Sequence, residues 1–176
     1  DLEGEKDLAR TQQMISLSMV CYLLLSLLTV SVQADELAAR ILPLRERAAL
    51  QDKIMLDRLE TLVPSLMRRE GIEAWVIIGR EYNEDPVLKT MLPATWLNAR
   101  RRTVLMFIDR GERGVERLAV ARYAVGSLFP GAWDPETQPD QYQRIAEILE
   151  EADPNKIALN SSDDYALADG LTLSEP

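Results

Sequence analysis

Apolar residues between positions 44 and 70 recur at steps of three and four, which is the spacing of one helical face. That face consists of Leu44, Ala48, Met55, Leu59, Leu62, Val63 and Leu66. Arg68 and Arg69 followed by Gly71 are a typical helix end. Pro64 lies inside the pattern, so we expect it either to kink the helix or to begin a second one.

Two continuous apolar runs, residues 74–79 and 103–108, have the length and composition of buried strands. The second run leads into a polar, glycine-containing turn at residues 109–114. Residues 116–123 then alternate between apolar and polar side chains. This pattern predicts a returning strand and therefore a β-hairpin.

Residues 141–152 form an amphipathic pattern whose apolar face carries Ile145, Ile148 and Leu149. Asp153-Pro154 should end this helix, and residues 156–160 should form another strand. The predicted order is helix, three strands, helix and strand. We therefore expect a layered α/β domain with a mixed sheet that is flanked by helices and contains one hairpin.

Residues 80–98 show no clean periodicity and contain Pro86 and Pro93. We expect a long loop there, with one helical turn around residues 87–91. Residues 126–140 contain three prolines and Gly131, so they are expected to be a second loop.

The N-terminal region resembles a targeting segment. No charged residue occurs between positions 11 and 34, and Val32-Gln33-Ala34 has small or modest residues at the positions that a signal peptidase recognises. We therefore divide the chain into a leader at 1–34, with the signal peptide at about 14–34, and a mature domain at 35–176. Export to the periplasm or the extracellular space is expected, and a membrane anchor formed by an uncleaved leader is the alternative.

The composition excludes several classes of function. The 176 residues carry a net charge of −9, which is not the electrostatic footprint of a general nucleic-acid binder. There is no histidine, so serine–histidine and cysteine–histidine catalysis are excluded. Cys21 is the one cysteine, so no intrachain disulfide can form. These residues alone predict an exported α/β domain without visible catalytic machinery.

Several carboxylates are close in sequence: Glu81 with Glu84-Asp85, Glu150-Glu151 and Asp163-Asp164. Calcium or magnesium can be held by such groups, but none of these clusters has the spacing of a calcium-binding loop. We interpret them as solvated surface charge. We therefore expect no catalytic and no metal-binding residue in this chain.

Arg100-Arg101-Arg102 stands directly before the second predicted strand. Guanidinium groups suit carboxylates, so the run is either a clamp for an anion or a basic strand edge that pairs with nearby acids. Trp75 and Trp96 are expected to be packing residues rather than ligand platforms. Asn160-Ser161-Ser162 fits the N-glycosylation pattern, which matters only in a eukaryotic secretory pathway.

Several stretches, in the same order along the chain, resemble exported bacterial Xaa-Pro-aminopeptidase-like proteins of the creatinase/prolidase (pita-bread) superfamily. The similarity runs from about residue 41 to the C-terminus, and the stretches are residues 45–47, 66–72, 75–86, 99–103, 131–135, 138–141 and 166–171. It implies a creatinase/prolidase N-terminal-type domain, with a mixed sheet and flanking helices.

The resemblance also implies a function. Such enzymes have a C-terminal pita-bread catalytic domain that holds two divalent metal ions, such as manganese, cobalt or zinc, on aspartates, glutamates and a histidine. Because this chain has no histidine, it should not hydrolyse peptides alone. It is expected to be the non-catalytic N-terminal domain of such a hydrolase, either as a fragment or as a truncated product. The alternatives are a free-standing periplasmic binding or interaction module and an enzyme with its own carboxylate site.

In this family the N-terminal domain takes part in homodimerisation and shapes the substrate entrance. That role falls most naturally on the loop between residues 80 and 102. The candidate entrance or interface residues are Arg80, Tyr82, Asn83, Trp96, Arg100, Arg101 and Arg102. The expected partners are the pita-bread domain, a second copy of the chain and a peptide substrate, with no nucleic acid.

Overall fold

A computed structural model of the chain describes residues 10, 12–14, 16, 18–22, 41–82, 84–165 and 170. The chain divides into two compact units, Asp1–Arg45 and Glu46–Pro176. In the first unit, the described residues from 10 to 22 are helical. Within the described part of the chain, no helix is long and apolar enough to cross a membrane. The expected cleavage site at Val32–Ala34 lies outside the described residues.

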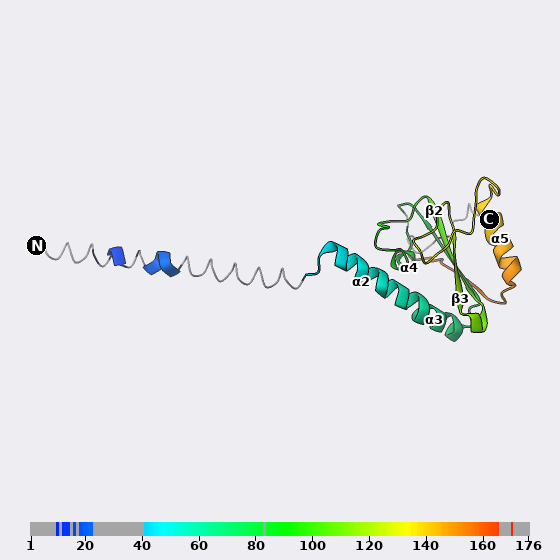
Figure 1. The fold of residues 1–176 in the computed structure, drawn as a ribbon, viewed down its shortest axis with the longest axis horizontal. Helices are drawn as coiled ribbons and strands as arrows, with labels where there is room; N and C mark the ends of the chain where they lie inside the picture. The colour runs from blue at the N-terminus through cyan, green and yellow to red at the C-terminus, as the bar shows by residue number, and fades with distance from the viewer. Residues whose placement is uncertain are drawn as a thin grey trace, which may run out of the picture. The chain divides into compact units, whose positions relative to one another are not determined.

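A four-stranded sheet forms the centre of the second unit (Figure 1). Its strands are β1 (Ala74–Arg80), β2 (Arg102–Asp109), β3 (Val115–Val120) and β4 (Ile157–Leu159), in the order β3-β2-β1-β4. β1 and β2 are antiparallel along their whole length, β2 and β3 form the expected hairpin, and β4 is parallel to β1. The prediction of an α/β fold with a mixed sheet is therefore confirmed.

The first long helical segment has three parts: α2 (Leu44–Asp57), a π-helical turn η1 (Arg58–Leu62) and α3 (Val63–Glu70). Pro64 lies in the first turn of α3, where a missing N–H does least harm, so it begins a second helix as one of our two expectations stated. The Val63 N–H donates to the Arg58 carbonyl in the wider π pattern. Gly71 ends α3 in a left-handed conformation with φ of 64°.

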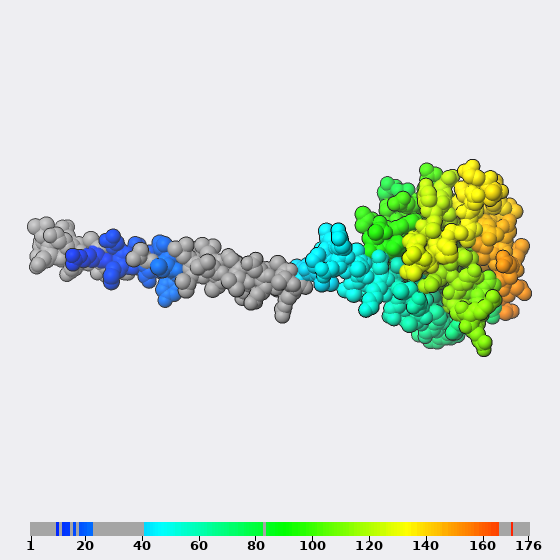
Figure 2. All heavy atoms as spheres, viewed as in Figure 1, coloured from blue at the N-terminus to red at the C-terminus, as the bar shows by residue number. Residues whose placement is uncertain are grey.

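Side chains alternate between the two faces of the sheet, and each face packs against a different helical layer. On one face, Ile77, Leu105 and Phe107 pack with buried side chains of α2, η1 and α3. On the other face, Val76, Val104 and Met106 pack with Ile145 and Ile148 of α5 (Gln141–Ala152). The core therefore consists of two apolar clusters separated by the sheet. Figure 1 shows α3 and α5 on different sides of the strands, and α5 forms one outer edge of this unit in the space-filling view of Figure 2.

The loop between β1 and β2 is held in place by apolar packing and hydrogen bonds. It contains the short helix α4 (Pro86–Thr90), which agrees with the single expected turn. Leu88, Met91 and Leu92 are buried. The Ala94 N–H donates to Asp52 of α2 at 2.8 Å, and the Arg58 guanidinium donates to the Thr90 carbonyl. The loop is therefore attached to the helical layer on that face of the sheet.

Two local expectations are wrong. β3 ends at Val120 rather than at residue 123, because residues 121–123 bend away from the sheet. Glu84 and Asp85 are buried instead of solvated. The Asp85 carboxylate caps α4, since it accepts the Val87 and Leu88 N–H groups at 2.6 and 3.1 Å.

Candidate anion-binding site

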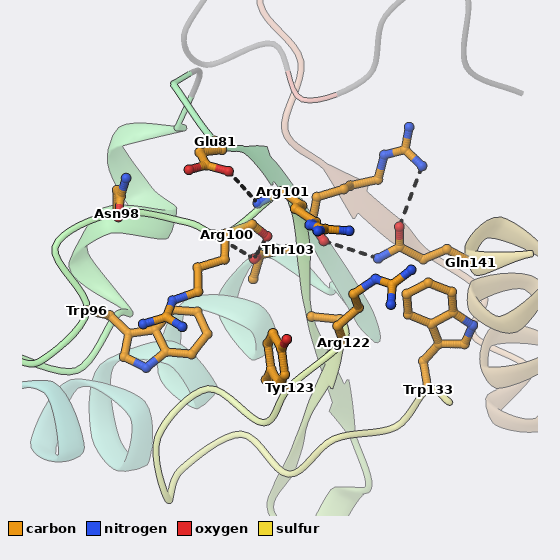
Figure 3. Close-up of a pocket in the computed structure, with 12 residues that line it drawn as sticks. Glu81, Trp96, Asn98, Arg100, Arg101, Thr103, Arg122, Tyr123, Trp133 and Gln141 are labelled. Atoms are coloured by element: carbon orange, nitrogen blue, oxygen red, sulfur yellow. Dashed lines mark hydrogen bonds between the residues drawn. The ribbon is translucent and has the colours of Figure 1, made fainter. Parts of the chain in front are cut away.

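A cavity of about 460 Å³ lies where the end of β1, the start of β2 and the residues after β3 meet (Figure 3). It is lined by Glu81, Trp96, Asn98, Arg100, Arg101, Arg102, Thr103, Ala121, Arg122, Tyr123, Trp133 and Gln141. We call this space the arginine cavity. Its volume falls in the range of small-molecule sites in proteins.

The main chain at Arg101 is fixed by Glu81. The Glu81 N–H donates to the Arg101 carbonyl at 2.6 Å, and the Arg101 N–H donates to the Glu81 carboxylate at 3.3 Å. Arg101 also has a φ of 52°, a left-handed conformation that is uncommon for a residue with a side chain. Glu81 therefore stabilises an unusual backbone conformation at the rim of the arginine cavity.

Arg100 is positioned by Thr103 and Trp96. The buried Thr103 hydroxyl donates to the Arg100 carbonyl at 3.1 Å and accepts the Arg100 N–H at 3.3 Å. The Arg100 guanidinium carbon lies 5.2 Å from the centre of the Trp96 ring, which is cation–π distance. The exposed guanidinium is thus held against an aromatic surface.

Arg102 is positioned from α5. Its guanidinium carbon lies 4.8 Å from the centre of the Tyr142 ring, and the guanidinium approaches the Gln141 side-chain oxygen at 3.5 Å. The buried Gln141 amide donates to the carbonyls of Val120 and Arg102 at 2.6 and 3.3 Å. Gln141 therefore joins α5 to the ends of both β2 and β3.

The remaining wall comes from the segment after β3. Figure 3 shows the side chains of Arg100 and Arg122 on the two sides of Tyr123. Tyr123 is 60% exposed, whereas Trp133 is half-buried and its indole N–H donates to the Gln138 carbonyl at 2.7 Å. Three aromatic rings, from Trp96, Tyr123 and Trp133, therefore line the same space as four arginines.

The charge of the cavity lining is unbalanced, with four arginines and one carboxylate, Glu81. Among the described residues, the guanidinium groups of Arg100, Arg101 and Arg122 have no carboxylate within ion-pair distance. Guanidinium groups bind carboxylate and phosphate oxygens through paired hydrogen bonds. A cavity with these groups favours an anion, although the whole chain is acidic.

The structure brings together four of the seven candidate residues: Trp96, Arg100, Arg101 and Arg102. Arg80 pairs with Arg102 across the two strands, but it is outside the cavity lining. Tyr82 is 85% exposed with a φ of 70° and is also outside the lining. Asn83 lies outside the described residues.

Sequence reasoning missed Arg122, Tyr123, Trp133 and Gln141 as site residues. A signal existed for three of them, because Arg122 and Tyr123 end the alternating pattern of the hairpin and Trp133 follows in a proline-rich loop. Of the two tryptophans expected to pack, Trp75 lies 5.6 Å from the Phe107 ring in the core. Trp96 packs against the same core cluster and also lines the arginine cavity.

The alternative interpretation of Arg100-Arg101-Arg102 is that these arginines form ion pairs with acids of the same loop. Glu81 binds the Arg101 main chain, and Asp85 is occupied by α4 and by the Asn160 amide at 3.3 Å. Neither carboxylate contacts a guanidinium of Arg100 or Arg101 within the described ranges. Within the described ranges, these two loop acids therefore do not pair with the side chains of Arg100 and Arg101.

The side-chain amide of Asn160 continues the pairing of β4 with β1. Its oxygen accepts the Ile78 N–H at 2.8 Å, and its nitrogen donates to the Ile78 carbonyl at 2.9 Å. The same nitrogen donates to Asp85, so both of its hydrogens are used. A glycan on Asn160 would break these bonds, and the glycosylation pattern is therefore incompatible with this conformation.

In the part of the chain that the structure describes, no group of three or more histidine, cysteine, aspartate or glutamate residues is arranged to hold a metal ion. Comparison with family models, curated proteins and solved structures finds no match to this chain.

Proposed function

We propose that this chain is the non-catalytic N-terminal domain of an exported Xaa-Pro-aminopeptidase-like metallopeptidase. In the complete enzyme it takes part in dimerisation and shapes the substrate entrance. The mixed α/β sheet and the order of the resembling stretches support this proposal. So does the loop between β1 and β2, both ends of which lie at the arginine cavity through Glu81 and Arg101.

One observation carries the proposal: three guanidinium groups, from Arg100, Arg101 and Arg122, surround a cavity without carboxylate partners among the described residues. These guanidinium groups are exposed, and like charges close together repel one another, so a bound anion would relieve that repulsion. A peptide carboxylate, or acids of a dimer partner, would supply the missing negative charge.

The catalytic chemistry is assigned to a partner domain of the pita-bread type. That domain would hold the two divalent metal ions, such as manganese, cobalt or zinc, because the chain described here has no histidine to complete the family's ligand set. The leader would direct export and would be removed after Ala34. The mature protein should then begin at Asp35, which N-terminal sequencing of the exported product would reveal.

The first experiment measures hydrolysis by the purified chain with added manganese, cobalt or zinc. We expect no cleavage of Xaa-Pro dipeptides. Metal-dependent turnover in a preparation shown to be free of host peptidases would contradict the assignment.

The second experiment uses the complete enzyme with Arg100 and Arg101 both changed to Ala. We expect a higher KM or a weaker dimer, because cations at the entrance or interface are removed. The melting temperature of this chain should be nearly unchanged, since both side chains are exposed. Arg113→Ala, an exposed arginine in the turn between β2 and β3, is the matched control. Unchanged kinetics and assembly together with lower stability would show a structural role only.

The arginine cavity itself favours a second candidate, a free-standing binding module, because its whole lining comes from this chain. The two functions differ in their need for a catalytic domain. A module of this kind would bind its ligand fully as the isolated chain and would form no complex with a pita-bread domain.

A further inference from the structure

A second hollow of about 560 Å³ adjoins the arginine cavity. The two share Ala121, Arg122, Tyr123 and Trp133 in their linings, so they adjoin each other at these residues. The second hollow is otherwise lined by Ala124, Gly131, Ala132, Asp134, Thr137, Gln138, Arg144 and Glu147. We call the two together the two-part groove. It is longer than a single small anion needs.

The two parts differ in charge. The arginine cavity carries guanidinium groups without carboxylate partners among the described residues. In the second hollow, Arg144 forms an ion pair with Glu147 at 3.0 Å, and the Gln138 amide also donates to Glu147 at 3.0 Å. The arginine hydrogen bond is the first cause of the low pKa of Glu147, which stays ionised and balances Arg144. The groove therefore has one cationic end and one nearly neutral end.

The backbone between the two parts is available for pairing. Ala119 is already paired on its outer side, because its N–H donates to the Pro130 carbonyl and its carbonyl accepts the Ala132 N–H. Residues 121–124 follow directly, and within the described residues they make no backbone–backbone hydrogen bond. Ala121 is buried, whereas Arg122, Tyr123 and Ala124 are exposed. Extended peptides bind exposed main-chain groups of this kind, with side-chain pockets to either side.

We propose that the two-part groove binds the C-terminal end of a peptide. The terminal carboxylate lies in the arginine cavity on Arg100, Arg101 and Arg122. The last side chain packs against the rings that line it, and the preceding residues run past residues 121–124 into the second hollow. This inference rests on the proposed function for its choice of a peptide, and it adds the recognised chemical group, the direction and the residues.

Other anions fit the groove less well. A small carboxylate or inorganic phosphate would fill the cationic end and leave the second hollow and the free backbone unused. Nucleic acid would bring a repeating negative charge against Asp134 and Glu147, in a chain of net charge −9.

The test measures binding to the full chain by calorimetry, with three probes. These are acetyl-Ala-Ala-Ala-Phe with a free carboxylate, the same peptide as its C-terminal amide, and acetyl-Phe. We expect the free acid to bind, and the amide to bind about tenfold more weakly or worse, because the charge-assisted hydrogen bonds are lost. Acetyl-Phe should bind more weakly than the tetrapeptide, because it lacks the residues that occupy the second hollow.

Two substitutions locate the site. Arg122→Ala should abolish measurable binding of the free acid, and Arg122→Lys should weaken it, since lysine keeps the charge but loses the paired geometry. Arg113→Ala is the control and should leave binding unchanged. Far-ultraviolet circular dichroism checks that each variant is folded. If Arg122→Ala does not fold, the Arg122→Lys result decides.

The proposal is overturned if the amide binds as tightly as the acid, or if Arg122→Lys binds like the unaltered chain. It is also overturned if acetyl-Phe or inorganic phosphate binds as tightly as the tetrapeptide, which would show a small-anion site. These outcomes are separable from the proposed function. Carboxylate-dependent binding to this chain, with unchanged kinetics and assembly of the complete enzyme in the Arg100/Arg101 variant, would refute the proposed function alone.

Discussion

Arginine side chains at the two ends of the β1–β2 pair differ in whether they contact a carboxylate. At one end, Arg68 of α3 donates to both oxygens of Asp109 at 3.0 and 3.2 Å and to the Gly111 carbonyl at 2.9 Å. At the other end, Arg100 and Arg101 have no such carboxylate among the described residues. The Arg68 guanidinium therefore forms its hydrogen bonds within the fold. The guanidinium groups of Arg100 and Arg101 keep donors that a bound anion could use.

The difference comes from what each neighbouring carboxylate binds. Asp109 ends β2 with its carboxylate beside the Arg68 guanidinium, whereas Glu81 follows β1 and binds the main chain of Arg101. The number of arginines in a region therefore says little about its function. The contacts of the nearest carboxylate separate an arginine that is paired within the fold from one that is a candidate for binding.

The largest loss of stability should come from a substitution in the core beneath both ends of the β1–β2 pair. Phe107 is fully buried, and its ring lies 5.6 Å from those of Trp75 and Phe129. Phe107→Ala should lower the free energy of unfolding by about 3–5 kcal/mol, because it leaves a cavity beside the rings of Trp75 and Phe129. Chemical denaturation measures this loss. Leu97→Ala, at a residue 91% exposed, should change stability by less than about 0.5 kcal/mol.

An intermediate loss of stability is expected from a substitution at the end of the β1–β2 pair that borders the arginine cavity. Gln141→Ala leaves the buried carbonyls of Val120 and Arg102 without their donor, so the loss should be about 1–3 kcal/mol. Gln143→Ala changes the same residue type two positions later on the exposed side of α5 and should cost much less. Peptide binding should also fall with Gln141→Ala, because the hydrogen bond that holds the end of β3, two residues before Arg122, is lost. Equal effects of the two substitutions would contradict the anchoring role of Gln141.

The smallest loss of stability should come from a substitution in the Arg68–Asp109 ion pair, and this loss should depend on pH. The hydrogen bond from Arg68 lowers the pKa of Asp109 from its ordinary value of 3.8, and the Gly111 N–H acts in the same direction. A carboxyl group with a lowered folded pKa stabilises the fold above its unfolded pKa and loses that effect as the pH falls through the folded value.

We therefore expect Asp109→Asn to be less stable than the unaltered chain near neutral pH, by less than Gln141→Ala. The difference should shrink as the pH falls below about 4. Thermal melts at several pH values measure it, with the exposed Glu112→Gln as control. A difference that stays constant down to pH 2 would mean that the ion pair does not stabilise the fold.

Regular elements were predictable because their patterns are local. The bounds of α5 agree with the expected 141–152, since the apolar spacing and the break at Asp153 are both in the sequence. The burial of Asp85 was also readable, because an aspartate directly before a proline is a typical helix start, yet we had assigned its charge to solvent.

The arginine cavity was only half predictable because its walls are far apart in the chain. Trp96 and the arginine run come from one loop, and that part was found from its composition. Arg122 and Gln141 reach the same space only through the β2–β3 register and the packing of α5, which no local pattern specifies. Long-range pairing, rather than residue type, decides which side chains share a site.

The side chain of Asn160 also determines how the domain would respond to mechanical load. β4 is three residues long, and the amide of Asn160 is the next link between that chain segment and β1. Tension on the backbone beyond residue 160 would act first on the two bonds to Ile78, and only afterwards on the ladder of β4. Pulling from that side should therefore open the sheet stepwise at its β4 edge, at low force, while β1, β2 and β3 stay joined.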